Sequence, residues 1–519
     1  MFVRSKTTEG RTYLQVVESY WQDGKPHQRI IATLGRLDKL TDHGSVDGIL
    51  KSLSRFSDKV RVHEEYKAGN LEAKDVLRIG PDLILSRLWE ELGIKKILKD
   101  LAKNTNYGFS LERAVYLSTL SRLFFPGSDR KAKRITRDYK IPGASSIELH
   151  QLYRAMTWLG GKRQIIEEAL FAENKNLFSK LSVVFFDTTS LYFEGGGGDT
   201  LGRRGYSKDR RPDEAQMVVG AVLDEVGRPI AAPMWPGNTT DAKTLIPVAS
   251  SLKERFGVGK VTFVADRGMV GKNNIKELQD KGFSYILGVK MRLEKKAMRE
   301  VLSRGGRFKE VTNNLKVKEV LYEKKRYIIC LNVEQKKKDI TDREIILSQL
   351  KDKLKTDASK LIGNNGYRRY LKVEKGSVSI NETKIKDEAR YDGKWVLITN
   401  TDMPAKEVAL KYKDLWQVEA VFRSAKSLLQ TRPIFHRIDD AILGHVFVSF
   451  LAIVLLKELK SRVDFAFEWD RLRQDLDCLY EIKVVEDGKA FLLRSPLQGS
   501  AGKVFKAVGV AIPPNVKEA

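Results

Sequence analysis

Hydrophobic and polar residues alternate near the N-terminus in a pattern that predicts a β-hairpin. The alternation covers residues 12–34, on both sides of Asp23 and Gly24. This dipeptide tolerates the positive φ angles of a two-residue turn. We therefore expect a small β-hairpin module with a linker over residues 1–75.

The next hundred residues have a helical pattern. Hydrophobic side chains recur every three or four positions, as at Leu85, Leu88 and Leu92. This spacing places them on one face of a helix. We therefore predict a helical domain over residues 76–180.

Short runs rich in Val, Ile and Phe mark residues 181–291 as a mixed α/β region. Three strand-like runs come first, and helical segments then alternate with two more, which predicts a mixed sheet. The runs Leu181–Asp187 and Lys260–Asp266 are typical of buried central strands, and each ends in an aspartate. We expect each aspartate to lie where its strand leaves the core.

A long interval separates these strands from the next acidic residue of interest. Glu419 follows Asp266 by 153 positions (419 − 266), more than one crossover helix needs. Strand-like alternation dominates residues 292–400, so we predict a β-rich insertion there. Residues 401–470 would complete the core, and residues 471–519 form a weakly patterned C-terminal segment.

One long helix is predicted over residues 405–430, between two prolines that limit it. Tyr412, Glu419 and Lys426 are seven residues apart and would stack on one face. A simpler interpretation is an amphipathic helix in which Glu419 pairs with Arg423 or Lys426.

Composition indicates a polyanionic partner. The chain of 519 residues has 93 Lys and Arg against 67 Asp and Glu, a net charge of +26. This excess favours nucleic acid, with an anionic membrane surface as the alternative. Two cysteines and scattered histidines fit a reducing cytoplasm and no structural zinc. The apolar run Ala441–Leu456 is shorter than a bilayer requires, so we expect a buried helix and no membrane.

The densest basic cluster before the core lies in the helical domain. It comprises Arg130, Lys131, Lys133 and Arg134, followed by Arg137. Such a cluster is either a solvated helix face or a phosphate contact. The net charge favours phosphate, so we assign DNA binding or dimerisation to this domain.

A glycine-rich, basic segment at residues 194–216 connects the first two predicted strands of the core. It lacks a GK[ST] sequence and is therefore not a P-loop. It is either a mobile loop that closes over a DNA strand or a disordered hairpin loop.

Three carboxylates are candidates for a metal site: Asp187, Asp266 and Glu419. Their hard oxygens suit Mg²⁺ or Mn²⁺, and their mutual repulsion would itself favour bound cations. Two ions about 4 Å apart could align a nucleophile and stabilise the leaving oxygen of a phosphodiester. We expect Asp187 to bridge two Mg²⁺ ions, for which Mn²⁺ can substitute, while Asp266 and Glu419 each hold one.

Four sequence segments together resemble a known family. They are VVFFDTTS, AQMVVGAVLDEVGRPIAAPMWPGNTTDAKTL, FVADRGMVGKNNIKEL and YKDLWQVEAVFRSAKSLLQTRPIFHR. Over roughly residues 180–460 they resemble the catalytic domain of DDE transposases of the IS4 superfamily, closest to the IS1634-like branch. The resemblance implies an RNase H-like core with Asp187, Asp266 and Glu419 as the catalytic triad.

The resemblance also implies DNA contacts. The family's helix signature is Tyr, two residues, Arg, three residues, Glu, six residues, Lys. Tyr412, Glu419 and Lys426 match it, whereas Leu415 stands where the arginine should be, with Lys413 as a possible substitute.

Arg423 and Trp395 are two further candidates for DNA contact. Arg423 could add to the phosphate contacts of this helix. Trp395 matches a family tryptophan that can stack on an extruded nucleotide, although a core tryptophan is the alternative.

These observations predict an α/β DNA transposase. It would act as a homodimer on the terminal inverted repeats of its insertion sequence and join their 3′-OH ends to target DNA. Two alternatives remain: an RNase H-like nuclease without strand transfer, and a catalytically inactive DNA-binding protein derived from a transposase.

Overall fold

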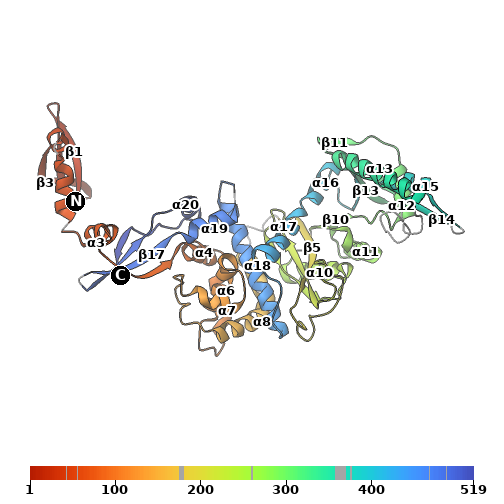
Figure 1. Cartoon of the computed structure of the whole chain (residues 1–519), viewed down its shortest axis with the longest axis horizontal. Helices are drawn as coiled ribbons and strands as arrows, with labels where there is room; N and C mark the ends of the chain where they lie inside the picture. The colour runs from red at the N-terminus through yellow and green to blue at the C-terminus, as the bar shows by residue number, and fades with distance from the viewer. Residues whose placement is uncertain are drawn as a thin grey trace. The chain divides into compact units, whose positions relative to one another are not determined.

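The computed structural model, drawn in Figure 1, divides into two compact units. Unit 1 comprises Met1–Gly80, Asp138–Lys140 and Glu468–Ala519, and unit 2 comprises Pro81–Arg137 and Ile141–Phe467. The domain boundaries expected from the sequence stay predictions. The structure describes residues 1–42, 44–54, 56–174, 181–258, 261–356, 370–374, 377–466, 468–486 and 488–519.

Unit 1 contains the predicted hairpin. Asp23 and Gly24 connect its strands with φ angles of 49° and 70°, as the sequence indicates. An unpredicted strand, β1, pairs antiparallel with β2, and the expected linker contains a helix, α3. The elements are β1 (Phe2–Thr8), β2 (Arg11–Gln22), β3 (Lys25–Arg36), α1 (Leu37–Asp42), α2 (Ser45–Ser54) and α3 (Asp58–Lys67).

A second sheet of unit 1 joins distant parts of the sequence. Its order is β19-β18-β17-β4, so a strand before residue 80 pairs with the C-terminal segment. Val62, Val484, Phe491 and Leu493 form its core. The elements are β4 (Ala73–Arg78), α19 (Trp469–Asp477), β17 (Tyr480–Glu486), β18 (Lys489–Arg494), α20 (Ala501–Val508) and β19 (Val516–Glu518).

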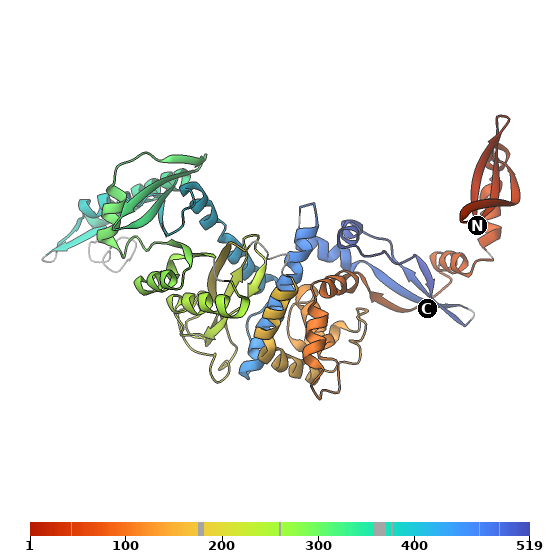
Figure 2. The same cartoon turned by 180° about the vertical axis from the view of Figure 1, so that it is seen from behind.

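Helices form the first part of unit 2, as predicted. The long helices α8 and α18 lie side by side, coloured gold and blue in Figure 2. Glycines allow this close approach, because a Cβ on Gly160 would lie 1.9 Å from Asp440 O and one on Gly444 would lie 2.0 Å from Met156 O. The helices are α4 (Gly80–Glu91), α5 (Ile94–Ala102), α6 (Leu111–Phe124), α7 (Asp129–Ile135), α8 (Leu149–Glu173) and α18 (Asp439–Arg462).

The α8–α18 contact gives a stability prediction. Gly160→Ala is expected to destabilise the fold by about 1–3 kcal/mol, the usual cost of overpacking, because the new methyl group meets backbone. Gly161→Ala is the matched control, since its Cβ would meet only Asp440 Oδ2, at 4.0 Å. The control should be neutral or slightly stabilising in urea unfolding. Equal midpoints for the two variants would contradict this account of the packing.

Helix α18 is the apolar run noted in the sequence. It is long and apolar enough to cross a membrane, but 78% of its most apolar window is buried within the protein. This burial confirms the predicted core helix.

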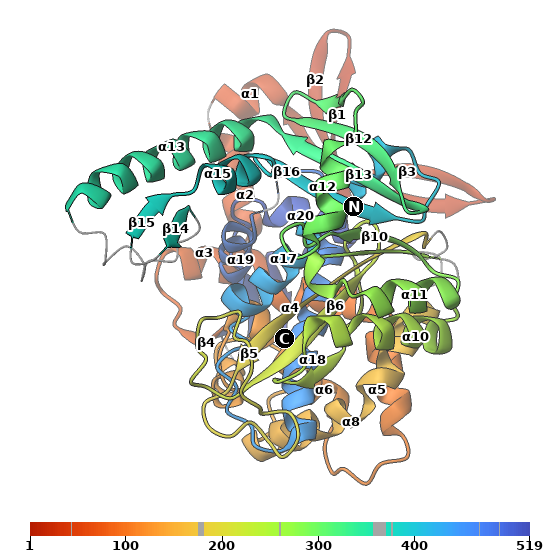
Figure 3. The same ribbon diagram turned by 90° about the vertical axis from the view of Figure 1, so that its right-hand side faces the viewer.

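A large mixed sheet forms the rest of unit 2, with the order β11-β12-β13-β16-β10-β9-β5-β6-β7 and β8 also paired with β6. Strands β5, β9 and β10 are parallel, and β6 is antiparallel to β5. Figure 3 shows α10 and α11 side by side. The elements are β5 (Val183–Tyr192), β6 (Gln216–Leu223), β7 (Pro229–Ala231), β8 (Met234–Pro236), η1 (Asp241–Lys243), α10 (Leu245–Phe256), β9 (Thr262–Ala265), η2 (Arg267–Met269), α11 (Lys272–Asp280) and β10 (Ser284–Gly288).

The predicted insertion contributes strands to this same sheet. Strand β16 pairs with both β10 and β13, so the β-rich segment continues the core sheet. A helix, α15, lies where strands were predicted, and residues 357–369 of that stretch lie outside the described residues. The elements are α12 (Lys295–Ser303), β11 (Lys309–Thr312), β12 (Leu315–Tyr322), β13 (Lys325–Asn332), α13 (Val333–Thr356), β14 (Leu371–Glu374), β15 (Ser377–Ile380), α15 (Glu382–Ala389) and β16 (Lys394–Thr399).

The prediction of one continuous helix over residues 405–430 was wrong. The stretch is helical but divided into α16 (Ala405–Lys413), α17 (Trp416–Arg423) and a π-helical turn, η4 (Ser424–Leu428). Between α16 and α17 the amide of Gln417 bonds to Asp414 O and that of Val418 to Leu415 O, which is the tighter i→i+3 pattern. A seven-residue spacing therefore does not keep one face through this segment.

Candidate active site

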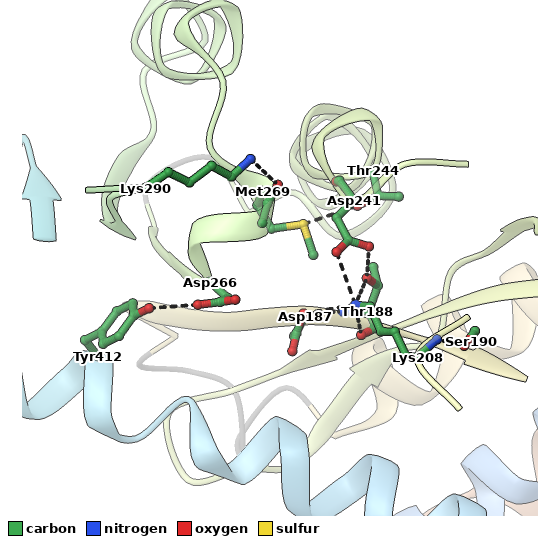
Figure 4. Close-up of polar contacts among 11 residues, drawn as sticks. Asp187, Thr188, Ser190, Lys208, Asp241, Thr244, Asp266, Met269, Lys290 and Tyr412 are labelled. Atoms are coloured by element: carbon green, nitrogen blue, oxygen red, sulfur yellow. Dashed lines mark hydrogen bonds and ion pairs between the residues drawn. The ribbon is translucent and has the colours of Figure 1, made fainter. Parts of the chain in front are cut away.

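The two aspartates at the ends of the hydrophobic runs lie on adjacent strands. The parallel pairing of β5 with β9 ends at Phe186 and Ala265, so Asp187 and Asp266 follow the last matched pair (Figure 4). One expectation was wrong: β5 does not end at Asp187 but continues to Tyr192. The reason is that β6 still pairs with β5 there, Asp187 opposite Ala221, after β9 has ended.

Asp187 is half-buried, and its surroundings favour a bound cation. Desolvation is the largest cause that raises its pKa, to about 6, and the charges of Asp266 and Asp241 act in the same direction. Lys208 and the Thr188 amide, which donates to Asp187 Oδ1 at 2.7 Å, act in the opposite direction. Carboxylate oxygens with this unbalanced negative charge fit a hard divalent ion.

Two residues of this site were missed in the sequence. Asp241 accepts a hydrogen bond from Thr188 Oγ1 at 2.6 Å, and its Oδ2 lies 3.2 Å from Lys208 Nζ. Asp241 begins the short helix η1 within the quoted segment GNTTDAKTL, so its place before a helix was the available signal. Lys208 had no such signal beyond the charge of its loop.

Tyr412 reaches the site from α16. Its hydroxyl donates to Asp266 Oδ1 at 3.0 Å, and burial followed by the charge of Asp266 raises the pKa of the phenol. Gly288 makes room for this ring, because a Cβ there would lie 2.4 Å from the Tyr412 oxygen. Tyr412 therefore orients Asp266.

Gly288→Ala is expected to destabilise the protein by about 1–2 kcal/mol, because the methyl group displaces the Tyr412 hydroxyl. Most of this cost should vanish in a Tyr412→Phe background, which removes the clashing oxygen. The measurement is a double-mutant cycle in urea, with Gly305→Ala, whose Cβ would meet nothing within 4 Å, as control. Additive effects would show that Tyr412 is not the residue displaced.

The structure does not bring Glu419 into a cluster with the aspartates. Glu419 is exposed in the first turn of α17, and α17 packs against β5 and β6. Among the residues that the structure describes, no three His, Cys, Asp or Glu side chains are grouped closely enough to hold a metal ion. Asp187 and Asp266 thus form the pair on the sheet, and the role of Glu419 stays a prediction.

Leu415, at the signature's arginine position, is 8% exposed and belongs to the hydrophobic core. Lys413 is exposed at the end of α16, and its charge acts on the Cys330 thiol of β13. Lys413 therefore lies close to β13.

Lys426 is held in a buried ion pair. Its Nζ donates to Asp209 Oδ1 at 2.8 Å, and Arg432 approaches Asp209 Oδ2 at 3.0 Å. The Lys426 and Asp209 side chains are only 12% and 7% exposed, and burial lowers the pKa of Lys426. In this state Lys426 is occupied by a carboxylate.

The two other predicted DNA contacts, Arg423 and Trp395, differ in how far their side chains are exposed. Arg423 is exposed at the end of α17. Trp395 is half-buried on β16, opposite Cys330, and its buried Nε1 has no hydrogen-bond acceptor among the described residues.

The basic cluster lies on α7. Arg130, Lys131 and Arg134 are exposed there. Lys133 instead donates to Ile147 O at 2.6 Å and pairs with Glu148 at 3.1 Å. Arg130 and Arg134 could thus meet a phosphate. Lys131 is exposed but donates to Pro126 O at 3.1 Å, and Lys133 holds the chain that leads into α8.

Comparison with known proteins identifies the family of the chain. Residues 178–455, more than half of the chain, match the family described as "Transposase DDE domain", and residues 2–66 match "IS1634 family transposase, N-terminal domain". No curated protein matches the sequence. A piggyBac transposase in a synaptic complex with hairpin DNA is similar at 9% identity over 76% of each chain, with a TM-score of 0.34, too low to support an argument here. The chain belongs to the DDE transposase family and carries the N-terminal domain of IS1634 family transposases.

Proposed function

We propose that this transposase cleaves the ends of its insertion sequence and joins the 3′-OH ends to target DNA by two-metal-ion phosphoryl transfer. The observation that carries the proposal is the adjacent pair Asp187 and Asp266, which combines half-buried negative charge with the oxygen chemistry of a divalent-metal site.

We also propose an RNase H-like core, and IS4 superfamily membership from the sequence segments quoted above. The strand order β7-β6-β5-β9-β10 supports the fold, with antiparallel strands followed by two strands parallel to β5.

Asp187, Asp266 and Glu419 would hold two Mg²⁺ ions, or Mn²⁺ in their place. When bound, the ions would relieve charge on the phosphoryl oxygens and lower the pKa of a bound nucleophile. The chain's own residues prepare the site: the Tyr412 hydroxyl orients Asp266, and the Thr188 amide orients Asp187.

DNA binding would use the exposed cations of unit 2. Arg130 and Arg134 on α7 and Arg423 on α17 are exposed and would contact phosphates, and Lys131 would join them by leaving Pro126 O. The net charge of +26 supports a polyanionic substrate. We further propose that the protein works in the cytoplasm and as a homodimer on paired inverted-repeat ends.

The α7 cluster gives a prediction about salt. Arg130→Ala and Arg134→Ala are each expected to reduce the slope of log K against log salt by about 1, because each removes one phosphate contact. Lys133→Ala is the matched control, since its ammonium is engaged with Ile147 O and Glu148. That variant should lower thermal stability and leave the slope unchanged, as measured by fluorescence anisotropy with a DNA duplex. Unchanged slopes in both arginine variants would remove α7 from the DNA contacts.

The inactive DNA-binding protein remains a second candidate because of one observation. Leu415 is buried where the signature has an arginine, so that position supplies no cation. Incubating the protein with a supercoiled plasmid that carries the element's ends, with Mg²⁺ and with EDTA, separates the two. Metal-dependent nicking eliminates the inactive protein, and binding without nicking supports it.

A further inference from the structure

Lys208 and Asp209 are consecutive residues of the loop between β5 and β6, and they make ion pairs with oppositely charged parts of the candidate site. Lys208 contacts the carboxylate half, Asp187 and Asp241, and Asp209 contacts the cation half, Lys426 and Arg432. The surrounding segment, residues 194–216, is the glycine-rich stretch whose sequence predicts a mobile or a disordered loop. In the structure its contacts are specific.

Lys208 occupies the carboxylate half. Its Nζ donates to Thr188 O at 2.7 Å and to Thr188 Oγ1 at 3.0 Å, and it lies 3.2 Å from Asp241 and 4.0 Å from Asp187 (Figure 4). One ammonium group thus serves two carboxylates, and one of them, Asp187, is a proposed metal ligand. It supplies positive charge at the place where a divalent ion would supply it.

Asp209 occupies the cation half. It pairs with Lys426 through one oxygen and with Arg432 through the other. A carboxylate between a lysine and an arginine has the charge and the oxygens of a DNA phosphate. While Asp209 stays there, Lys426 cannot contact a phosphate.

The backbone holds the segment in this position. The Lys208 amide donates to Ser190 Oγ on β5 at 2.9 Å, and Gln216 Nε2 donates to Tyr206 O at 3.0 Å. The two side chains therefore extend from a turn that is hydrogen-bonded to β5 and to the first residue of β6.

The buried ion pair of Asp209 is incompletely satisfied. Asp209 Oδ2 and Arg432 Nε are both buried without a hydrogen-bond partner among the described residues, although the two side chains lie 3.0 Å apart. A buried charge with a missing hydrogen bond is costly, and an exchange that completes its bonding is favourable. A phosphate that completes the missing hydrogen bonds can therefore replace Asp209 beside Arg432.

We propose that Lys208 and Asp209 form an electrostatic latch that occupies both halves of the site before substrate binds. Lys208 competes with the divalent cation, and Asp209 competes with the DNA phosphate for Lys426 and Arg432. The latch rests on the proposed function, because it requires that the site binds metal and DNA. Cation and phosphate would release adjacent residues, so each would favour the other's binding.

The first test measures metal binding without DNA. Lys208→Met is expected to tighten Mn²⁺ binding by about tenfold, because the competing ammonium is gone. Free Mn²⁺ is measured by electron paramagnetic resonance, with Arg204→Met as a control that removes a positive charge from an exposed position of the same loop. Equal or weaker Mn²⁺ binding by a folded Lys208→Met protein overturns the latch. If neither wild type nor variant binds Mn²⁺, the proposed metal-dependent function fails instead.

The second test measures DNA binding without metal. Asp209→Asn is expected to steepen the dependence of log K on log salt by about one to two, because Lys426 and Arg432 become available to phosphates. Asp213→Asn is the matched control, since it makes the same charge change in the same loop at a side chain that is 70% exposed. A slope no steeper than that of the control, or a loss of folding in Asp209→Asn, identifies a structural ion pair and overturns the latch.

Discussion

An Asp187→Asn variant is expected to be more stable than wild type at pH 8 without metal, and to lose DNA cleavage by about 10³-fold or more. Burial raises the pKa of Asp187 to about 6, so the folded state holds the ionised carboxylate at a cost. Replacing it with a neutral amide removes this cost, worth up to about 3 kcal/mol. The same change removes the proposed ligand of two metal ions, which accounts for the lost activity.

The sign of the pH dependence follows from the direction of the shift. Above about pH 6 the folded protein carries the full cost of the charged group. As pH falls from about 6 towards the ordinary value of 3.8, the folded state takes up the proton first, and the cost disappears. The stability gain of Asp187→Asn should therefore be greatest above pH 6 and vanish below about pH 4.

Urea unfolding across this pH range measures the effect, with exposed Asp213→Asn as the control. Added Mn²⁺ should stabilise wild type but not Asp187→Asn. An Asp187→Asn protein that is less stable at pH 8, or that still cleaves DNA, would contradict the assignment.

A Glu419→Gln variant is expected to retain folding and DNA binding while losing cleavage by about 10³-fold. Glu419 is exposed on α17, which packs against the strand that carries Asp187, so the isosteric amide should not disturb the helix. Binding to inverted-repeat DNA, thermal stability and cleavage are measured on the same preparation. Glu407→Gln, at an exposed position in the first turn of α16, is the matched control and should cleave normally. Joint loss of folding and binding would assign Glu419 a structural role.

The strand pair that carries Asp187 and Asp266 could be predicted because its signal is local. Runs such as VVFFD and TFVAD are too apolar for any place but a buried sheet, and an aspartate after each run must meet the edge of the core. The sequence could not reveal that β5 continues past Asp187. This depends on the neighbouring strands, because β6 still pairs with β5 beyond the point where the pairing with β9 ends.

The helix predicted over residues 405–430 could not be described correctly from the sequence. The spacing of Tyr412, Glu419 and Lys426 assumes ideal helical geometry, but a tighter turn near Leu415 and a π turn at η4 break it. Neither irregularity is visible in the periodicity of the sequence.

Long-range ion pairs were equally hidden. Lys208 lies 33 positions before Asp241 (241 − 208), and Asp209 lies 217 before Lys426 (426 − 209). The sequence alone does not indicate which charged residue of a glycine-rich loop forms an ion pair, because the partners are distant in the chain.

The most direct test of the central claim is strand transfer. Labelled DNA with pre-cut inverted-repeat ends and free 3′-OH groups is incubated with the purified protein, Mg²⁺ and an unlabelled plasmid, with Asp187→Asn and EDTA as controls. A DNA transposase of this mechanism is expected to join the label to the plasmid only when both Mg²⁺ and Asp187 are present. Cleavage of uncut ends in a parallel reaction, with no joining of the pre-cut ends, would identify a nuclease, and the central claim would be contradicted.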